Sequence, residues 1–156
     1  MKPNPFNDQV YFDSCAFNGG TDEDIEAAGK LIHIFESTNN KIMLSYSVAE
    51  EMNHSKAPED KRHRAEYSIK TVRIPLTDEE TSKLKKIEEI MLGKSSSSKR
   101  KADCLHVFEA QKYGRYFVSS DDHIYPYAES IFNEFGLYIV RPIELLKIVE
   151  YYQSEA

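Results

Sequence analysis

Four carboxylic acids are the residues of this chain whose types and spacing point most clearly to chemistry. Each stands where a predicted strand ends or a predicted helix begins: Asp13, Glu50, Asp103 and Asp121. Several carboxylates held close together cannot all stay ionised without a counter-charge. Mg²⁺ or Mn²⁺ supplies that charge and prefers oxygen ligands. Because a metal held in this way activates water and stabilises charge on a phosphoryl group, the four acids predict phosphodiester hydrolysis.

Two of the acids follow apolar, β-prone runs of the sequence. Asp13 ends the run 9–12, and Asp121 follows the strand predicted over 116–118, behind a pair of serines that includes Ser119. Sites in an open parallel sheet form at the carboxyl ends of the strands. We therefore expect both carboxylates at one edge of a sheet.

The other two acids lie at predicted helix starts. Glu50 comes three residues after Ser47, which is the spacing of a capping box at the start of a helix. Asp103 lies in the first turn of a helix expected over 102–113. If that helix packs antiparallel to the strand that follows it, its start lies at the same sheet edge. All four acids then converge, although they are far apart in the sequence.

Each acid also has a purely structural interpretation. Glu50 could be only a capping-box partner, and Asp103 could simply favour the helix dipole. Asp121 and Asp122 could form a turn. Asp13 is harder to explain in this way, because a carboxylate that ends an apolar strand needs a partner. The combination is more specific than any single member.

The elements that must position these acids alternate along the chain. The predicted strands cover 9–12, 42–44, 71–74, 116–118 and 138–140. The predicted helices begin near 21, 47, 58, 77, 102, 129 and 142. Strands separated by helices indicate the α/β class, with a central parallel sheet of about five strands flanked by helices.

Length and composition indicate one soluble domain over residues 1–156. The chain has 40% hydrophobic residues and a formal net charge of −6, and no interdomain linker is visible. A basic, serine-rich run over 94–101 predicts a flexible loop. No apolar stretch is long enough to span a membrane, and the first residues lack the apolar core of a signal peptide. We therefore expect a cytoplasmic protein without a membrane partner.

Taken in order, these motifs resemble those of the PIN-domain family of metal-dependent ribonucleases. The matching segments are an apolar strand that closes on an acid, a Ser-x-x-Glu helix start, an acid that opens a helix, and a second strand that leads to an acid. They lie at 10–15, 47–50, 102–114 and 117–121. The resemblance runs from residue 10 to about residue 142. Two features depart from compact toxins of the family: surplus length around 78–100, and an acid at Glu51 where an apolar residue is common.

The resemblance implies a metal-dependent endoribonuclease that hydrolyses RNA with bound Mg²⁺ or Mn²⁺. It implies catalytic and metal-binding roles for the four acids and supporting roles for two neighbours: Asp13, Glu50, Asp103, Asp121, Ser119 and Asp122. Small members are VapC-type toxins, so the implied partners besides RNA are an antitoxin protein and a second copy of the chain. The alternative is a PIN-like module that binds RNA or protein without catalysis.

Basic residues beside the third acid are candidates for holding RNA. Lys99, Arg100 and Lys101 come just before Asp103, and we hypothesise that they contact the phosphate backbone. The alternative is an ordinary solvated loop. A second basic stretch over 61–64 is flanked by acids, so it is a weaker candidate. The five histidines lack zinc-ligand spacing and are interpreted mainly as structural residues.

Overall fold

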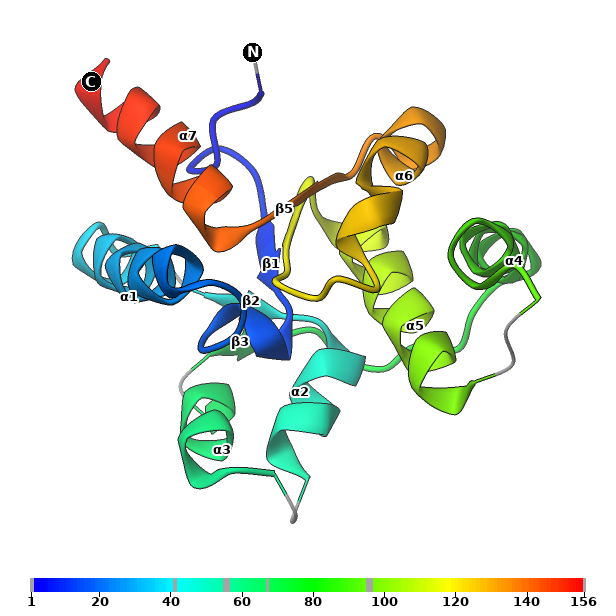
Figure 1. Ribbon diagram of the computed structural model, residues 1–156. Helices are drawn as coiled ribbons and strands as arrows, with labels where there is room; N and C mark the ends of the chain where they lie inside the picture. The colour runs from blue at the N-terminus through cyan, green and yellow to red at the C-terminus, as the bar shows by residue number, and fades with distance from the viewer. Residues whose placement is uncertain (1, 41, 55–56, 67, 95–96, 156) are drawn as a thin grey trace.

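Short apolar runs of the sequence form the strands of one parallel sheet. The computed structural model describes residues 2–40, 42–54, 57–66, 68–94 and 97–155 (Figure 1). Within them the strand order is β3-β2-β1-β4-β5, and each neighbouring pair is parallel. The strands are β1 (Val10–Phe12), β2 (Met43–Leu44), β3 (Ile69–Lys70), β4 (Tyr116–Val118) and β5 (Tyr138–Val140). The α/β class predicted from the sequence is therefore confirmed.

Helices connect the strands and cover both faces of the sheet. In Figure 1, α1 and α7 pack together on one side of the sheet, and α5 and α6 lie on the other. No helix in the described part of the chain is long and apolar enough to cross a membrane. The helices are α1 (Asp22–Ser37), α2 (Tyr46–Asn53), α3 (Glu59–Glu66), α4 (Asp78–Leu92), α5 (Ser98–Tyr113), α6 (Ala128–Phe135) and α7 (Pro142–Ser154), with short 3-10 helices η1 (Ser14–Ala16) and η2 (Tyr125–Tyr127).

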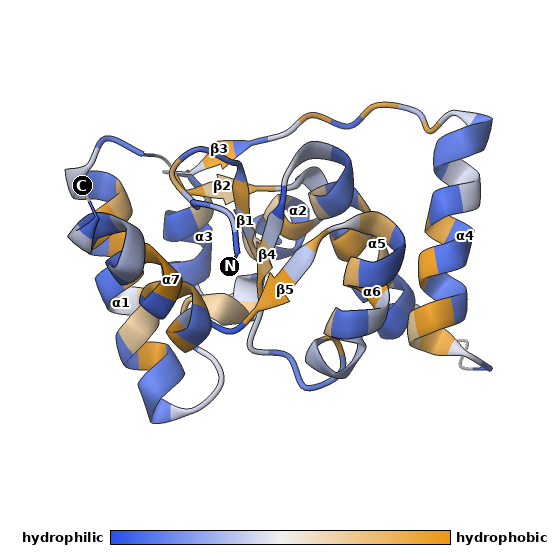
Figure 2. Ribbon diagram, turned by 90° about the horizontal axis from the view of Figure 1, so that it is seen from above, coloured by the Kyte–Doolittle hydropathy of each residue, from blue (hydrophilic) through white to orange (hydrophobic). Residues whose placement is uncertain are grey.

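The two central strands, β1 and β4, are buried along their whole length. Figure 2 shows them as hydrophobic ribbons between the two helical layers. Helices on both faces exclude water, which is why these strands are continuous apolar runs without alternation. Phe12 is in register with Val118, so both strands end at the same level. The residues that follow them, Asp13 and Ser119, are therefore brought side by side.

The start of α2 differs from the prediction. Ser45, not Ser47, is the N-cap residue, and its side chain makes no capping hydrogen bond. The predicted capping box between Ser47 and Glu50 is therefore wrong. The Ser47 hydroxyl instead contacts two side chains of α5, which are described with the site.

Two other boundaries also shift. The helix expected to begin at 102 begins at Ser98, so the loop predicted over 94–101 is wrong for its last four residues. Lysine and arginine are good helix formers, and they extend the first turn of α5. Residues 95–96 of that predicted loop lie outside the described residues. The strand expected over 71–74 is the short β3, which ends at Lys70.

Candidate active site

Asp13 is held in a buried position at the end of β1. Its side chain is 4% exposed. One carboxylate oxygen accepts the Ser14 backbone N–H at 2.8 Å, and the other accepts the Ser119 hydroxyl at 2.9 Å and the Cys15 thiol at 3.3 Å. Burial raises the pKa of Asp13, although these hydrogen bonds and the positive charge of His106 act in the opposite direction. The fold thus keeps a carboxyl group where its charged form is costly.

Ser119 connects Asp13 to the loop that carries Asp121. Its hydroxyl donates to Asp13 and accepts the backbone N–H of Asp121 at 3.1 Å. The loop is further shaped by Asp121 itself, whose Oδ1 accepts the His123 backbone N–H at 2.8 Å. Ser119 therefore lies beside Asp13, as expected from the sequence.

We expect Ser119→Ala to destabilise the protein by about 1–3 kcal/mol, because it leaves a buried carboxylate oxygen with a weaker set of donors. Ser120→Ala is the matched control, since the Ser120 hydroxyl is buried and has no hydrogen-bond partner among the described residues. Its loss should be neutral or stabilising. Urea unfolding at neutral pH measures both. Equal destabilisation by the two substitutions would contradict the role given to Ser119.

Asp103 lies on α5 and faces the same cluster. Its side chain is 6% exposed, and its Oδ2 atom is buried without a hydrogen-bond partner among the residues described. Burial, followed by the negative charges of Asp121 and Asp13, raises the pKa of Asp103 from 3.8 to about 6, against the opposing charge of His106. The three aspartates therefore act on one another, as expected for acids gathered at one sheet edge.

Glu50 does not join them, which corrects the expectation from sequence. Its side chain is exposed and lines a groove with Val72 and Arg73. Glu51 instead faces the acids, and its Oε2 atom lies 2.8 Å from Nε2 of His106. Successive residues of an α-helix point about 100° apart, so a change in the start of α2 decides which glutamate faces the site.

A buried histidine that was not predicted from the sequence completes the cluster. His106 is 2% exposed. Its Nδ1 atom lies 2.7 Å from the Ser47 hydroxyl, which donates to Glu109 at 2.5 Å. Since that hydroxyl proton is directed to Glu109, Nδ1–H donates to Ser47 and Nε2–H donates to Glu51. Both ring nitrogens then carry protons, as in an imidazolium ion.

The charge of His106 follows from its surroundings. Burial of the ring acts to lower its pKa, but the hydrogen bond to Glu51 and the negative charges of Asp13, Glu51 and Asp103 outweigh burial and raise the pKa. The signal in the sequence was the spacing, because His106 lies three residues after Asp103 and so on the same face of a helix. The cluster thus contains its own positive charge.

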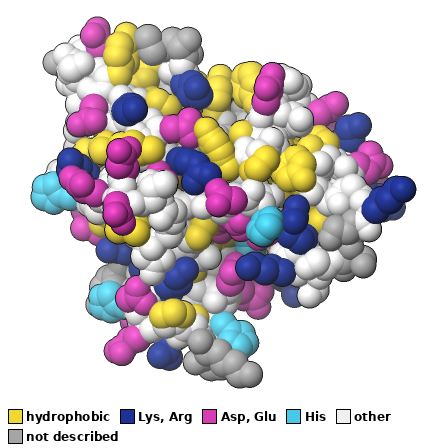
Figure 3. Space-filling view, viewed as in Figure 1, with side chains coloured by type: hydrophobic (Ala, Val, Ile, Leu, Met, Phe, Trp, Pro, Cys, Tyr) yellow, Lys and Arg dark blue, Asp and Glu magenta, His cyan; other side chains and the backbone are white. Residues whose placement is uncertain are grey.

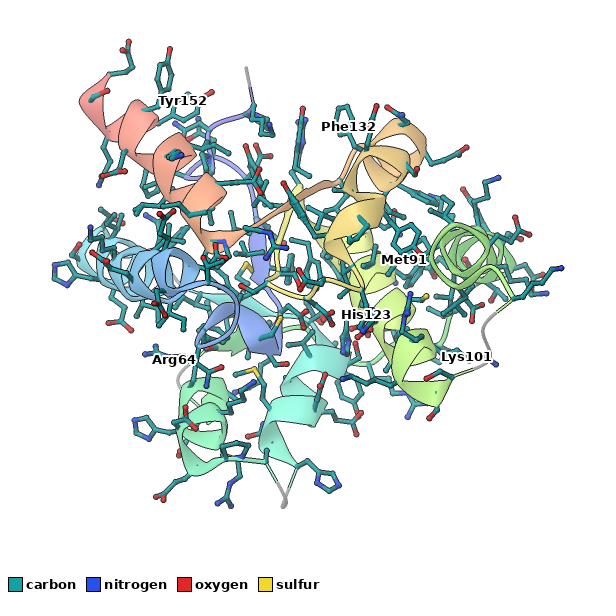
Figure 4. The ribbon with its side chains drawn as sticks, viewed as in Figure 1. Arg64, Met91, Lys101, His123, Phe132 and Tyr152 are labelled. Carbon is teal, nitrogen blue, oxygen red and sulfur yellow. The ribbon has the colours of Figure 1, made fainter. Side chains whose placement is uncertain are left out.

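The other predicted residues lie around this centre. Asp122 is exposed and accepts Nη2 of Arg141 at 2.6 Å, so it anchors the loop that carries Asp121. Arg100 donates to the Met91 backbone carbonyl at 3.3 Å and contacts His123, which links α5 to α4. In Figure 4, the labelled His123 lies close to α5.

Two lysines flank the acidic centre. The pKa of Glu51 is lowered, first by the hydrogen bond from His106 and further by the positive charges of Lys61 and Lys99. Lys61 also lines a cavity of about 370 Å³ with Ser14 and Glu51. Figure 3 shows basic side chains next to acidic ones where α2 and α5 meet. Lys99 was expected near the site, whereas Lys61 belongs to the stretch that was the weaker candidate.

The donor atoms fit a hard divalent cation in their chemistry. Carboxylate oxygens are the ligands that Mg²⁺ and Mn²⁺ prefer, and the unpartnered Oδ2 atom of Asp103 is free to coordinate. In the described part of the chain, however, no three His, Cys, Asp or Glu side chains are already arranged around one position for an ion.

Comparison with known proteins finds no protein-family model, no curated protein and no solved structure that matches this chain. The likeness to PIN domains therefore stays a resemblance in the order of the motifs. What the site can do must follow from its own residues.

Proposed function

We propose that this chain is a metal-dependent endoribonuclease that hydrolyses RNA phosphodiester bonds with bound Mg²⁺ or Mn²⁺. One observation carries the proposal: Asp13 and Asp103 are buried together beside Asp121, and one Asp103 oxygen has no hydrogen-bond partner among the described residues. Buried like charges cost free energy, and a divalent cation offsets that cost. The acidic cluster lowers the stability of the metal-free fold, and a bound cation would remove that cost.

The residues of the site have distinct roles in this proposal. Asp13, Asp103 and Asp121 would hold the ion, and Glu51 takes the place that the resemblance gave to Glu50. A bound ion of this type polarises a phosphoryl oxygen and lowers the pKa of a bound water. Ser119 orients the Asp13 carboxylate through its hydrogen bond.

RNA must be attracted locally, because the chain as a whole carries a net charge of −6. Lys61 on α3 and Lys99 on α5 both place positive charge close enough to Glu51 to lower its pKa. Lysine side chains bind backbone phosphates, and such contacts weaken as salt is added. We therefore assign substrate attraction to these two lysines rather than to Arg100, which is engaged by α4 and His123.

End-labelled single-stranded RNA incubated with the protein and Mn²⁺ tests the proposal. We expect cleavage that EDTA abolishes and that Asp13→Asn lowers by at least about 10²-fold, more than typically follows from loss of an outer-shell partner. Asp8→Asn is the matched control, because Asp8 precedes β1 at the opposite end from Asp13. Equal cleavage by wild type and Asp13→Asn would contradict the proposal.

A second candidate, an RNA- or protein-binding module without catalysis, is favoured by His106. The buried imidazolium already offsets part of the negative charge of Asp13 and Asp103. An acidic cluster whose negative charge is offset by a buried histidine can be stable without a metal. Under this candidate, RNA is retained in EDTA and no cleavage products form in Mn²⁺.

A further inference from the structure

Arg141 follows the strand β5 at the edge of the sheet where the acids gather. Strand β4 is in register with β1 on one side and with β5 on the other, down to the last residue of each strand. The residues that come next, Asp13, Ser119 and Arg141, therefore lie at one level of the sheet. Arg141 is the N-cap residue of α7, and its side chain is 25% exposed. The fold thus brings an arginine to the edge that carries the acids.

The guanidinium group of Arg141 contacts the loop that carries Asp121 at two points. Its Nη2 atom donates to Oδ1 of Asp122 at 2.6 Å, and its Cζ atom lies over the ring of Tyr125, 4.6 Å from the ring centre. Both contacts fall within the turn 121–125, in which the Asp121 carbonyl accepts the backbone N–H groups of Ile124 and Tyr125, each at 3.0 Å. A planar guanidinium can bond a carboxylate and lie over an aromatic ring at the same time.

A buried acid at the start of α1 fixes Arg141 from the other side. Asp24 is 1% exposed, and its Oδ2 atom lies 3.7 Å from Nη1 of Arg141. The other oxygen of Asp24 accepts the backbone N–H of Ile143 at 3.3 Å, so the carboxylate joins the starts of α1 and α7 (Figure 1). An ion pair with an acid as exposed as Asp122 contributes little by itself. The buried Asp24 gives the arginine a fixed point from which it can hold the loop.

The same helix start also packs directly against the loop. Gly20 has a φ of +89°, and a Cβ atom at this position would come within 2.8 Å of Oδ2 of Asp24 and within 2.9 Å of the Ser120 side chain. Only glycine adopts this backbone conformation readily and leaves room for so close an approach. The loop therefore meets the start of α1 directly at Ser120 and, through Arg141, at Asp122.

We propose that Arg141 is a positioning residue, which holds the turn 121–125 so that the Asp121 carboxylate stays at the acidic cluster. Oδ1 of Asp121 accepts the backbone N–H of His123 within this turn, so a turn that loosens also releases the side chain. Arg141 acts through Asp122 and the turn, without contact with the ion or the RNA. Asp122 then supports the turn and is not a metal ligand. The effect of Arg141 on catalysis rests on the proposed function, whereas its effect on the turn does not.

Amide hydrogen exchange of the metal-free protein tests this role. Arg141→Ala should raise the exchange rates of the Ile124 and Tyr125 amides by at least about tenfold and leave those of β4 unchanged. Arg115→Ala is the matched control, since Arg115 also lies over a tyrosine ring, at 5.9 Å, but precedes β4 at the opposite end of the sheet. Unchanged exchange of the two turn amides in Arg141→Ala would overturn the proposal. An equal rise in the turn and in β4 would also overturn it, because it would indicate a general loss of stability.

A double-mutant cycle tests whether Arg141 acts through Asp122. Asp122→Asn alone should also speed exchange of the turn amides, and adding it to Arg141→Ala should have little further effect because the contact is already lost. Additive effects of the two substitutions would overturn the assigned contact.

The kinetics of RNA cleavage in Mn²⁺ test the consequence for catalysis. Arg141→Ala should lower kcat by at least about tenfold and change KM for RNA by less than about threefold, since the arginine supports a metal-binding loop and does not touch the RNA. A raised KM with unchanged kcat would overturn the positioning role. A wild type that cleaves no RNA would count against the proposed function, and the exchange rates of the turn would still decide the role of Arg141.

Discussion

Replacing Asp103 with asparagine is expected to make the metal-free protein more stable and, in the same variant, to abolish metal-dependent cleavage of RNA. The native carboxylate is buried, and one of its oxygens has no hydrogen-bond partner in the described part of the chain. Asparagine has nearly the same shape but carries no charge. We expect a gain of about 1–2 kcal/mol at pH 7, less than the full pKa shift implies because neighbouring charges and solvent screen it.

The pH dependence of unfolding separates this electrostatic effect from a change in packing. The ordinary pKa of an aspartate such as Asp103 is 3.8. In the folded protein the pKa of Asp103 is raised to about 6, first by burial and then by the negative charges of Asp121 and Asp13. Between these values the folded state binds more protons than the unfolded state. The contribution of the Asp103 carboxyl group to stability is therefore present below about pH 4 and is lost as the pH rises through about 6.

Urea unfolding of wild type and Asp103→Asn from pH 4 to pH 7, without metal, measures this difference. The two curves should approach each other at the acidic end and separate as Asp103 ionises. Asp78→Asn, an exposed acid at the start of α4, serves as the control for loss of one negative charge. A variant that is less stable than wild type at pH 7 would contradict the account of Asp103 as a strained carboxylate.

Removing His106 is expected to have the largest effect on stability. His106→Ala removes the proton donor to Glu51, leaves a cavity between α2 and α5, and takes away a positive charge that lowers the pKa of Asp13. Truncation of a large buried side chain that also loses its hydrogen bonds costs about 2–4 kcal/mol. His33→Ala, at an exposed position on α1, should change the free energy of unfolding by less than about 0.5 kcal/mol.

The pH dependence of this penalty identifies its electrostatic part. The pKa of His106 in the folded protein lies above its ordinary 6.5, since Glu51 and the charges of Asp13 and Asp103 outweigh burial. The stability gained from the charged ring is present below pH 6.5 and is lost as the pH rises through the raised value. The difference in unfolding free energy between wild type and His106→Ala should therefore shrink as the pH rises, until only the cost of the lost packing remains. A penalty that is independent of pH would indicate a neutral, purely packing role.

The sequence predicted most of the framework because its signals were local. The strands at 116–118 and 138–140 are found within the predicted bounds, since each is an apolar run closed by turn residues. The helices expected to begin near 21 and 77 do begin there, as α1 and α4, and the structure shows a capping box at the start of each. Asp13 is placed by the strand that it ends, so its position followed directly from the run before it.

The site was predicted only in part because its remaining members depend on tertiary contacts. Whether Glu50 or Glu51 faces the acids depends on where α2 begins, and the Ser47 hydroxyl that suggested a cap is bound by α5 instead. The contact of His106 with Glu51 joins residues 55 positions apart. No local sequence pattern predicts a contact between residues so far apart in the chain.

Binding of Mn²⁺ followed by electron paramagnetic resonance tests the central claim, that the carboxylates of this sheet edge hold a divalent cation. Free Mn²⁺ is titrated with wild type, Asp13→Asn, Asp103→Asn and the control Asp8→Asn, and the loss of the free-ion signal measures binding. The account predicts saturable binding by wild type and Asp8→Asn and at least about tenfold weaker binding by the two site variants. Binding of equal strength in all four proteins, or no binding by wild type, would contradict it.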